Sequence, residues 1–310
     1  MERAVLEGQH RRAAMRHIDR LQSVFSRHAI TPTYVVDFPV ASQPEGFKPL
    51  KDFADAGQAR IGAHLHPWVN PPFVEEVTTR NSFGCCLGEA LETEKIQVLR
   101  TEIGEAFGRP PTVYKAGRYG FGPTTAAALE ALDFSVDVSV NPRMNYTSEG
   151  GPSFDAFDTT PFFFGQRRRL LEIPCSTDYT GVAGRFSPGL HRLISQPALH
   201  RARLAGVMSH LHVVNKIMLS PEGSTLAEMK SLTTALLGRG VRTFSLTMHS
   251  PSVEPGCTPY VRTTAELRHF LDRVAAYCDF FVGEVGGTPS TPEDFFERVS
   301  RAHPRQECFS

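Results

Sequence analysis

The chain has 310 residues, of which 41% are hydrophobic and 21% are charged, and Lys plus Arg equals Asp plus Glu at 33 each. This composition can fill a sizeable core and is unlike that of a disordered chain. The balance of charge leaves no basic field of the kind that holds nucleic acid, so we expect no nucleic-acid partner.

The start of the chain and its cysteines indicate a compartment. No apolar segment follows the first charged residues, so no signal peptide is expected. No apolar run approaches the roughly 20 residues that a membrane helix needs. The six cysteines include no CxxC pair, which argues against a thiolate zinc site, and without a secretion signal they should be reduced. These features predict a cytoplasmic protein without an integral membrane segment.

Helical and strand patterns alternate along the chain. Apolar residues at helical spacing, such as Met15, Ile18 and Leu21, predict a first helix over 11–28, and β-rich runs predict strands. In chain order the expected elements are helix 11–28, strand 33–37, helix 48–56, strand 59–66, helix 87–107, strand 112–116, helix 123–132, strand 134–140, strand 170–175, helix 189–213, strand 216–219, helix 224–238, strand 241–248, helix 263–277, strand 279–285 and a helix from about 291 capped by Thr291.

This alternation predicts βαβ units and an α/β fold with a parallel sheet. Seven or eight strands suit a closed barrel better than an open sheet, and we expect one domain over 1–310. The loops 67–84, 141–165, 176–188 and 250–262 each follow a predicted strand. In a β/α barrel such loops form the active face.

The most informative local pattern is Ile61-Gly-Ala-His-Leu-His-Pro-Trp68. Residues two apart in a strand point to the same face, so His64 and His66 could share one metal ion. The alternative is a pair of hydrogen-bonded histidines beside a loop. Ser209-His-Leu-His212 has the same spacing within a predicted helix, where residues two apart do not face each other, and is interpreted as structural.

Three further positions could contribute to chemistry. Lys115 and Arg118, in Tyr114-Lys-Ala-Gly-Arg-Tyr-Gly-Phe-Gly122, offer fixed cations or are solvated charges of a glycine-rich connection. His249 ends a predicted strand and could transfer a proton near neutral pH. Asp37 and Asp137 lie in predicted strands and should each have a partner, a salt bridge being the structural alternative.

Several segments together resemble the polysaccharide deacetylases of the NodB-homology superfamily, and most closely the WalW-like branch. They are Pro32-Thr-Tyr-Val-Val-Asp-Phe-Pro39, Ile61-Gly-Ala-His-Leu-His-Pro-Trp-Val-Asn-Pro-Pro72, Tyr114-Lys-Ala-Gly-Arg-Tyr-Gly120, Val136-Asp-Val-Ser-Val140 and His249-Ser-Pro-Ser-Val-Glu-Pro-Gly-Cys-Thr-Pro-Tyr-Val-Arg262. They occur in the expected order over about residues 12–285.

The resemblance implies a distorted barrel of about seven β/α units and a divalent metal, usually zinc, held by two histidines and an aspartate. The histidines correspond to His64 and His66, the Arg-containing motif to Lys115 through Arg118, and the general acid to His249. Relatives begin with a strand whose acidic motif supplies the metal aspartate and the catalytic base, and no such strand is recognisable here. Either the start has been lost or misassigned, or the metal site is incomplete; Asp37 could substitute as a ligand.

The implied activity is metal-dependent hydrolysis of the N-acetyl group of an amino-sugar glycan or a lipid-linked sugar precursor. Lys115, Arg118 or a backbone amide would stabilise the oxyanion, and Trp68, Phe73, Tyr119 and Tyr260 could pack on sugar faces. The alternatives are a non-catalytic sugar- or metabolite-binding protein on the same barrel and a metal-free structural partner in a glycan-assembly complex. Without the first strand we expect a gap beside residues 33–37 lined by exposed apolar side chains, and little activity. No oligomeric state follows from the sequence.

Overall fold

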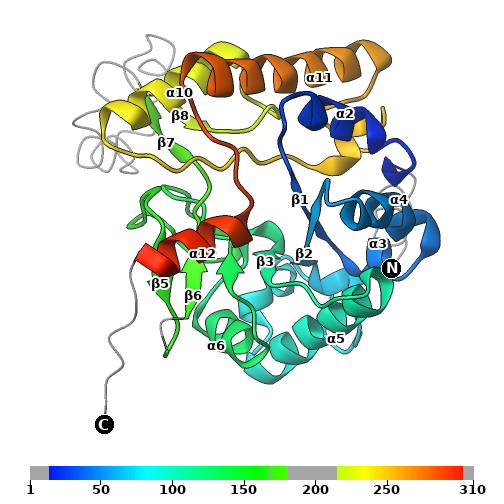
Figure 1. The fold of residues 1–310 in the computed structure, drawn as a ribbon. Coiled ribbons are helices and arrows are strands. Elements are labelled where there is room, and N and C mark those ends of the chain that lie inside the picture. Colours follow the sequence, from blue (N-terminus) through cyan, green and yellow to red (C-terminus); the bar gives the residue numbers. More distant parts are fainter. Residues whose placement is uncertain (1–13, 168, 181–214, 303–310) are drawn as a thin grey trace.

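The computed structural model describes residues 14–167, 169–180 and 215–302 (Figure 1). One six-stranded sheet has the order β1-β2-β3-β4-β6-β5. Its strands are β1 (Thr33–Val36), β2 (Arg60–Leu65), β3 (Val113–Ala116), β4 (Val136–Asp137), β5 (Phe162–Phe164) and β6 (Leu170–Glu172). All neighbouring strands are parallel except β5, which runs antiparallel to β6 at one edge. The predicted α/β fold with a mostly parallel sheet is confirmed.

The helices lie close to the predicted positions. They are α2 (Asp19–Arg27), α3 (Phe38–Ala41), α4 (Pro44–Asp55), α5 (Glu89–Phe107), α6 (Pro123–Ala131), α10 (Leu226–Gly238), α11 (Thr264–Asp279) and α12 (Pro292–Ala302). Side-chain caps fix several starts: Thr225 and Glu228 form a capping box on α10, and Thr291 accepts from the backbone N–H of Asp294 at the start of α12. The expected helix 189–213, with its Ser209-His-Leu-His212, lies outside the described residues.

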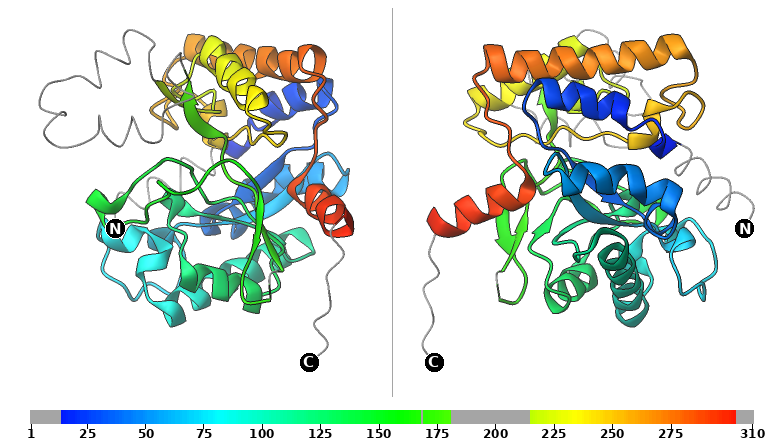
Figure 2. Two further views of the ribbon diagram at one scale, coloured as in Figure 1. Left: turned by 90° about the vertical axis from the view of Figure 1, so that its left-hand side faces the viewer. Right: turned by 45° about the vertical axis from the view of Figure 1, so that its right-hand side comes forward.

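The two faces of the sheet are covered by different helices, as the alternation of strand side chains requires. Val113, Val136 and Leu171 pack with Phe295 and Phe296 of α12. The opposite face carries the largest apolar cluster and packs on α5 and α6, which lie side by side beneath it (Figure 2). A sheet covered on both faces explains why its strands are short and nearly continuous in apolar residues.

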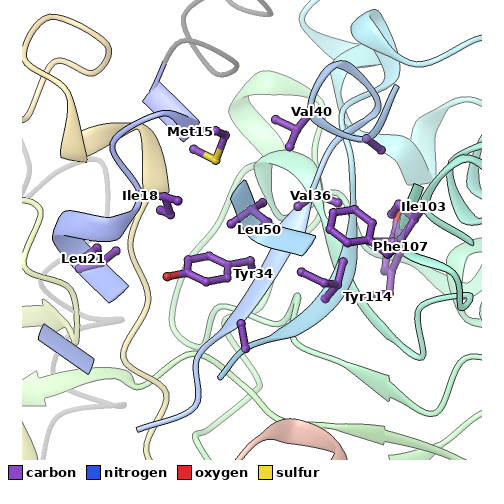
Figure 3. Close-up of a cluster of buried hydrophobic side chains, with 14 of the residues drawn as sticks. Met15, Ile18, Leu21, Tyr34, Val36, Val40, Leu50, Ile103, Phe107 and Tyr114 are labelled. Carbon is purple, nitrogen blue, oxygen red and sulfur yellow. The ribbon is translucent and has the colours of Figure 1, made fainter. Parts of the chain in front are cut away.

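The core around β1 and β2 joins segments that are distant in the sequence. Tyr34 and Val36 of β1 lie between side chains of α2 and those of α4 and α5, including Leu50 and Phe107 (Figure 3). The Tyr34 hydroxyl donates to Gln22 Oε1 at 2.9 Å, so this buried polar atom is satisfied.

A second, two-stranded sheet pairs β7 (Thr177–Thr180) with β8 (Asn215–Met218) in antiparallel fashion. It packs against α10, and α11 lies beside α10 in the upper part of Figure 1. Their shared apolar cluster contains Ile217, Leu219, Met229, Leu232, Leu236, Tyr277 and Phe280.

The predicted closed barrel of seven or eight strands is wrong for the described residues. The six-stranded sheet is open, with β1 and β5 at its edges. Residues 241–248, predicted as a strand, join no ladder; Thr247 N donates to Leu219 O at 3.2 Å. Residues 279–285 continue α11 as the π-helix η8 (Phe280–Glu284).

The failure at 279–285 has a packing reason. Phe280, Phe281 and Val282 favour a strand by composition. However, Tyr277 contacts Phe280 and Phe281 with ring centroids 6.0 and 6.2 Å apart, and residues three and four apart meet only on a helix. Tyr277 and Phe280 are buried together with Ile217 of β8 and Met229 of α10, and these tertiary contacts override the local preference.

The predicted gap beside β1 is confirmed only in part. Among the described residues β1 pairs with β2 alone. The prediction of exposed apolar side chains there is wrong: Met15, Ile18 and Leu21 are buried, because α2 packs against α11 and the 3₁₀ turn η7 (Ser250–Val253). Residues 1–13 lie outside the described part. No helix within the described ranges is long and apolar enough to cross a membrane.

Candidate active site

Chemically capable side chains gather where the parallel strands end. His64 is the last residue but one of β2 and His66 directly follows that strand. Lys115 is the last residue but one of β3, and Asp137 and Glu172 are the last residues of β4 and β6. Carboxyl ends of parallel strands share one edge of the sheet, which is where open α/β sheets bind ligands. The predicted convergence of these segments on one edge therefore holds in the open sheet.

His64 and His66 lie next to each other, with ring centroids 4.3 Å apart and planes 76° apart. His64 Nδ1 is 3.0 Å from the carbonyl oxygen of Lys115, its register partner. Because a carbonyl oxygen only accepts, Nδ1 carries the hydrogen, and metal ligation would fall to Nε2. His66 packs on Trp68, with centroids 4.6 Å apart.

Asp37 caps a helix, in addition to any other contact that it makes. Its side chain is buried and accepts from the backbone N–H of Val40 at 3.3 Å, which caps α3. Within the described ranges no three His, Cys, Asp or Glu side chains are grouped so as to hold a metal ion. His64 has the fixed tautomer of a ligand and lies beside His66, but these residues fall short of the expected three-ligand set.

The ammonium group of Lys115 is surrounded by protein groups. Nζ donates to Val138 O at 2.9 Å, lies 3.8 Å from Cys175 Sγ and stands 4.8 Å from the centroid of the Tyr119 ring. These contacts join the ends of β3, β4 and β6 and place the Tyr119 ring. A role of Lys115 toward an oxyanion stays a prediction.

Arg118 is held by the segment that precedes α5. Its guanidinium donates to Ser82 Oγ at 2.6 Å, pairs with Glu149 and lies 4.5 Å from the centroid of the Phe83 ring. Arg118 and Tyr119 both have positive φ, 52° and 60°, in the 3₁₀ turn η4 (Gly117–Tyr119). A catalytic role of Arg118 also stays a prediction.

His249 forms a carboxylate–imidazole pair with Glu222. Its Nδ1 lies 2.7 Å from Glu222 Oε2, and the same oxygen accepts from the backbone N–H of His249 at 3.0 Å. The Glu222 side chain is only 3% exposed, whereas that of His249 is 64% exposed. Ser252 Oγ donates to the other oxygen of Glu222, and the Tyr260 ring stacks on His249 at 5.8 Å. Glu222 is thus held in place by the protein, whereas His249 is open to solvent.

Glu222 is the residue of the candidate site that the sequence analysis did not single out. It follows β8 in Ser220-Pro-Glu-Gly223, a turn-like sequence with no recognised motif. The one available indication was its place after a predicted strand in an α/β pattern.

Aromatic and polar side chains connect the strand ends with the His249 region. Tyr119 stacks on Tyr146 at 5.6 Å, and its hydroxyl lies 3.7 Å from Met218 Sδ at the end of β8. Burial raises the pKa of Tyr119 well above its ordinary value, with smaller contributions that include Tyr260 and Glu222. Tyr119 therefore lies within electrostatic reach of the His249 pair and stays a neutral phenol.

The loop after His66 is fixed by a buried cation. Lys95 is 0% exposed, and its Nζ donates to the carbonyl oxygens of Pro67, Asn70 and Pro72 at 3.1, 2.6 and 2.6 Å. It also pairs with Glu75 Oε1 at 3.0 Å. These four contacts hold the loop in place, where a strand would be held by backbone hydrogen bonds to its neighbours.

No protein-family model matches the chain, and no curated protein matches it. Among solved structures it is similar to a crystal structure described as that of a "putative polysaccharide deacetylase" from Mycobacterium smegmatis. The two are 17% identical with a TM-score of 0.45, over 89% of this chain and 79% of that chain.

Proposed function

We propose that the chain hydrolyses the N-acetyl amide of an amino-sugar glycan or a lipid-linked glycan precursor. The observation that carries the proposal is the pair of an exposed His249 with a buried Glu222, which lies within electrostatic reach of Tyr119 in the turn after β3. The resemblance of the sequence to polysaccharide deacetylases supports the choice of substrate class.

The geometry of the pair suits proton transfer. A carboxylate accepts the Nδ1 hydrogen of His249, which fixes the tautomer. Nε2 is then the atom that exchanges protons with a substrate. As water adds to the acetyl carbon and the C–N bond breaks, the imidazolium form of His249 gives its Nε2 proton to the leaving nitrogen. Acetate and a sugar amine result, and the proton released from the water returns to Nε2 and restores the imidazolium.

Exposed aromatic rings near the histidines support a sugar ligand. Tyr260, 47% exposed, stacks on His249, and Phe73, 67% exposed, is in the loop fixed by Lys95. Flat apolar rings with a polar neighbourhood suit the C–H faces of sugar rings.

Dependence on a divalent metal, such as zinc, is a separate part of the proposal. His64 and His66 would hold the ion, which would supply Lewis-acid activation of the amide. Because the described residues do not complete a three-ligand site, the proton transfer at His249 is proposed independently of a metal ion. The same observation favours the second candidate function, a protein that binds the sugar without hydrolysing it.

The test is acetate release from N-acetylglucosamine oligosaccharides by the full chain, measured together with oligosaccharide binding by calorimetry. Replacing His249 by Ala should lower kcat by about 10²–10⁴-fold and preserve binding. His269→Ala, an exposed histidine on α11, is the matched control. Binding without acetate release would favour the second candidate, and neither binding nor release would refute both.

A further inference from the structure

Asp137 and Glu172 form a pair of acids inside the sheet. They are register partners on β4 and β6, and both are 0% exposed. Two buried carboxylates side by side repel each other and lose their hydration, so both cannot remain ionised. The sequence-based expectation of a partner for Asp137 is met, but the partner is another acid.

The donors around Asp137 are those of an ionised carboxylate. Ser139 Oγ donates to Oδ1 at 2.6 Å, and Ser139 N donates to Oδ2 at 3.1 Å. Ser139 Oγ itself accepts from Ala116 N at 2.7 Å, so its hydrogen points to Asp137. Both oxygens of Asp137 are therefore acceptors.

Glu172 has the opposite character. Its Oε1 accepts from Val140 N at 3.0 Å, whereas its Oε2 is buried and meets no donor among the described residues. Two register partners that are both fully buried can lie side by side only if one of them carries a proton, and a buried oxygen that meets no donor is where this proton can sit. Burial raises the pKa of both acids, and for Glu172 the charge of Asp137 adds to this and raises its pKa well above the ordinary value, in agreement with a proton on Glu172.

We infer that Asp137 and Glu172 share one proton, with a protonated Glu172 donating to an ionised Asp137, so that the pair carries a single negative charge beneath the candidate site. The charged and titratable groups around it are Lys115, which favours the ionised Asp137, and Tyr114 and Cys175. The pair is a positioning device. Through Ser139 it ties the end of β4 to Ala116 at the end of β3. The inference is independent of the proposed hydrolysis.

Two isosteric substitutions distinguish this charge assignment from simple packing. Glu172→Gln keeps a donor toward Asp137, so its melting temperature at neutral pH should stay within about 3 °C of the wild type. Asp137→Asn directs an amide N–H₂ at one of the two Ser139 donors, and its melting temperature should fall by about 5 °C or more.

The pH dependence of folding stability tests the same charge assignment. A folded-state pKa above the unfolded value contributes stability that is present below the unfolded pKa and is lost as pH rises through the folded pKa. The wild type should therefore lose stability as pH rises above the ordinary glutamate range, and Glu172→Gln should lose less.

Infrared spectroscopy detects the proton directly. The wild type at neutral pH should show the C=O band of a protonated carboxyl group that disappears in Glu172→Gln. Burial also raises the pKa of Glu92, so Glu92→Gln identifies that second band. A spectrum unchanged by Glu172→Gln would overturn the inference, as would equal destabilisation by the two substitutions. If Asp137→Asn does not fold, the infrared comparison still decides.

Discussion

The Nδ1 atom of His66 occupies the space in which a side chain at Gly117 would begin. A Cβ atom built on Gly117 would stand 2.5 Å from that nitrogen and would also overlap the carbonyl oxygen of Leu65. The end of β2 and the turn after β3 can therefore lie against each other only because residue 117 has no side chain.

Gly117→Ala should displace the His66 ring and destabilise the fold by about 1–3 kcal/mol through overpacking. Gly238→Ala is the matched control, because a Cβ there meets open space at the end of α10. Denaturant unfolding measures the stability, and histidine side-chain NMR reports the ring. Equal stability of the two variants would contradict this view of Gly117.

Lys95→Met should cost about 3–5 kcal/mol of unfolding free energy, since it leaves Glu75 buried without its cation. Hydrogen exchange over residues 67–75 should accelerate as well. Lys48→Met removes an exposed pair with Asp52 and should change stability by less than about 1 kcal/mol. Unchanged exchange in the loop would show that Lys95 does not fix it.

Glu222→Gln should lower kcat less than His249→Ala does, because the imidazole remains but loses its charged acceptor. The double variant should be no slower than His249→Ala alone, since the two residues act as one unit. Steady-state kinetics on the N-acetylated oligosaccharide measure both effects. Additive losses would mean that Glu222 acts independently of His249.

His64 and His66 are expected to bind a divalent metal together. Protein purified with zinc should contain bound metal, and the variant with both residues changed to Ala should not. Elemental analysis measures this without reference to activity, and His269→Ala should match the wild type. Full metal content in the double variant would exclude the two histidines as ligands.

The elements with strong local patterns were predictable from the sequence. Helix 87–107 corresponds to α5 (Glu89–Phe107), and strand 59–66 corresponds to β2 (Arg60–Leu65) with the histidines at its end. The barrel was not predictable, because closure depends on how strands at the edges pair. The predicted strand at 279–285 was wrong because Tyr277 and Phe280 pack as part of a helix against side chains of β8 and α10, which the local sequence does not show.

The candidate site was predictable as a set of positions but not as a set of interactions. The sequence singled out His249 at the end of a predicted strand but could not indicate its partner, because Glu222 is 27 residues away and has no motif of its own. Likewise, the sequence indicated that Asp137 needs a partner but could not show that Glu172 lies opposite it, because register is a tertiary property.

Arg118 and Tyr119 place two consecutive non-glycine residues in the left-handed region, which costs roughly 1–2 kcal/mol each for an L-residue. The backbone of this turn is therefore strained. It is held in place by the contacts of Arg118 with Ser82 and Glu149 and by the stacking of Tyr119 on Tyr146. We expect that loss of one of these contacts lets the backbone relax and moves the Tyr119 ring. Substitutions of Ser82 or Glu149 should therefore alter the position of Tyr119 at the carboxyl ends of the strands, where we propose that the ligand binds.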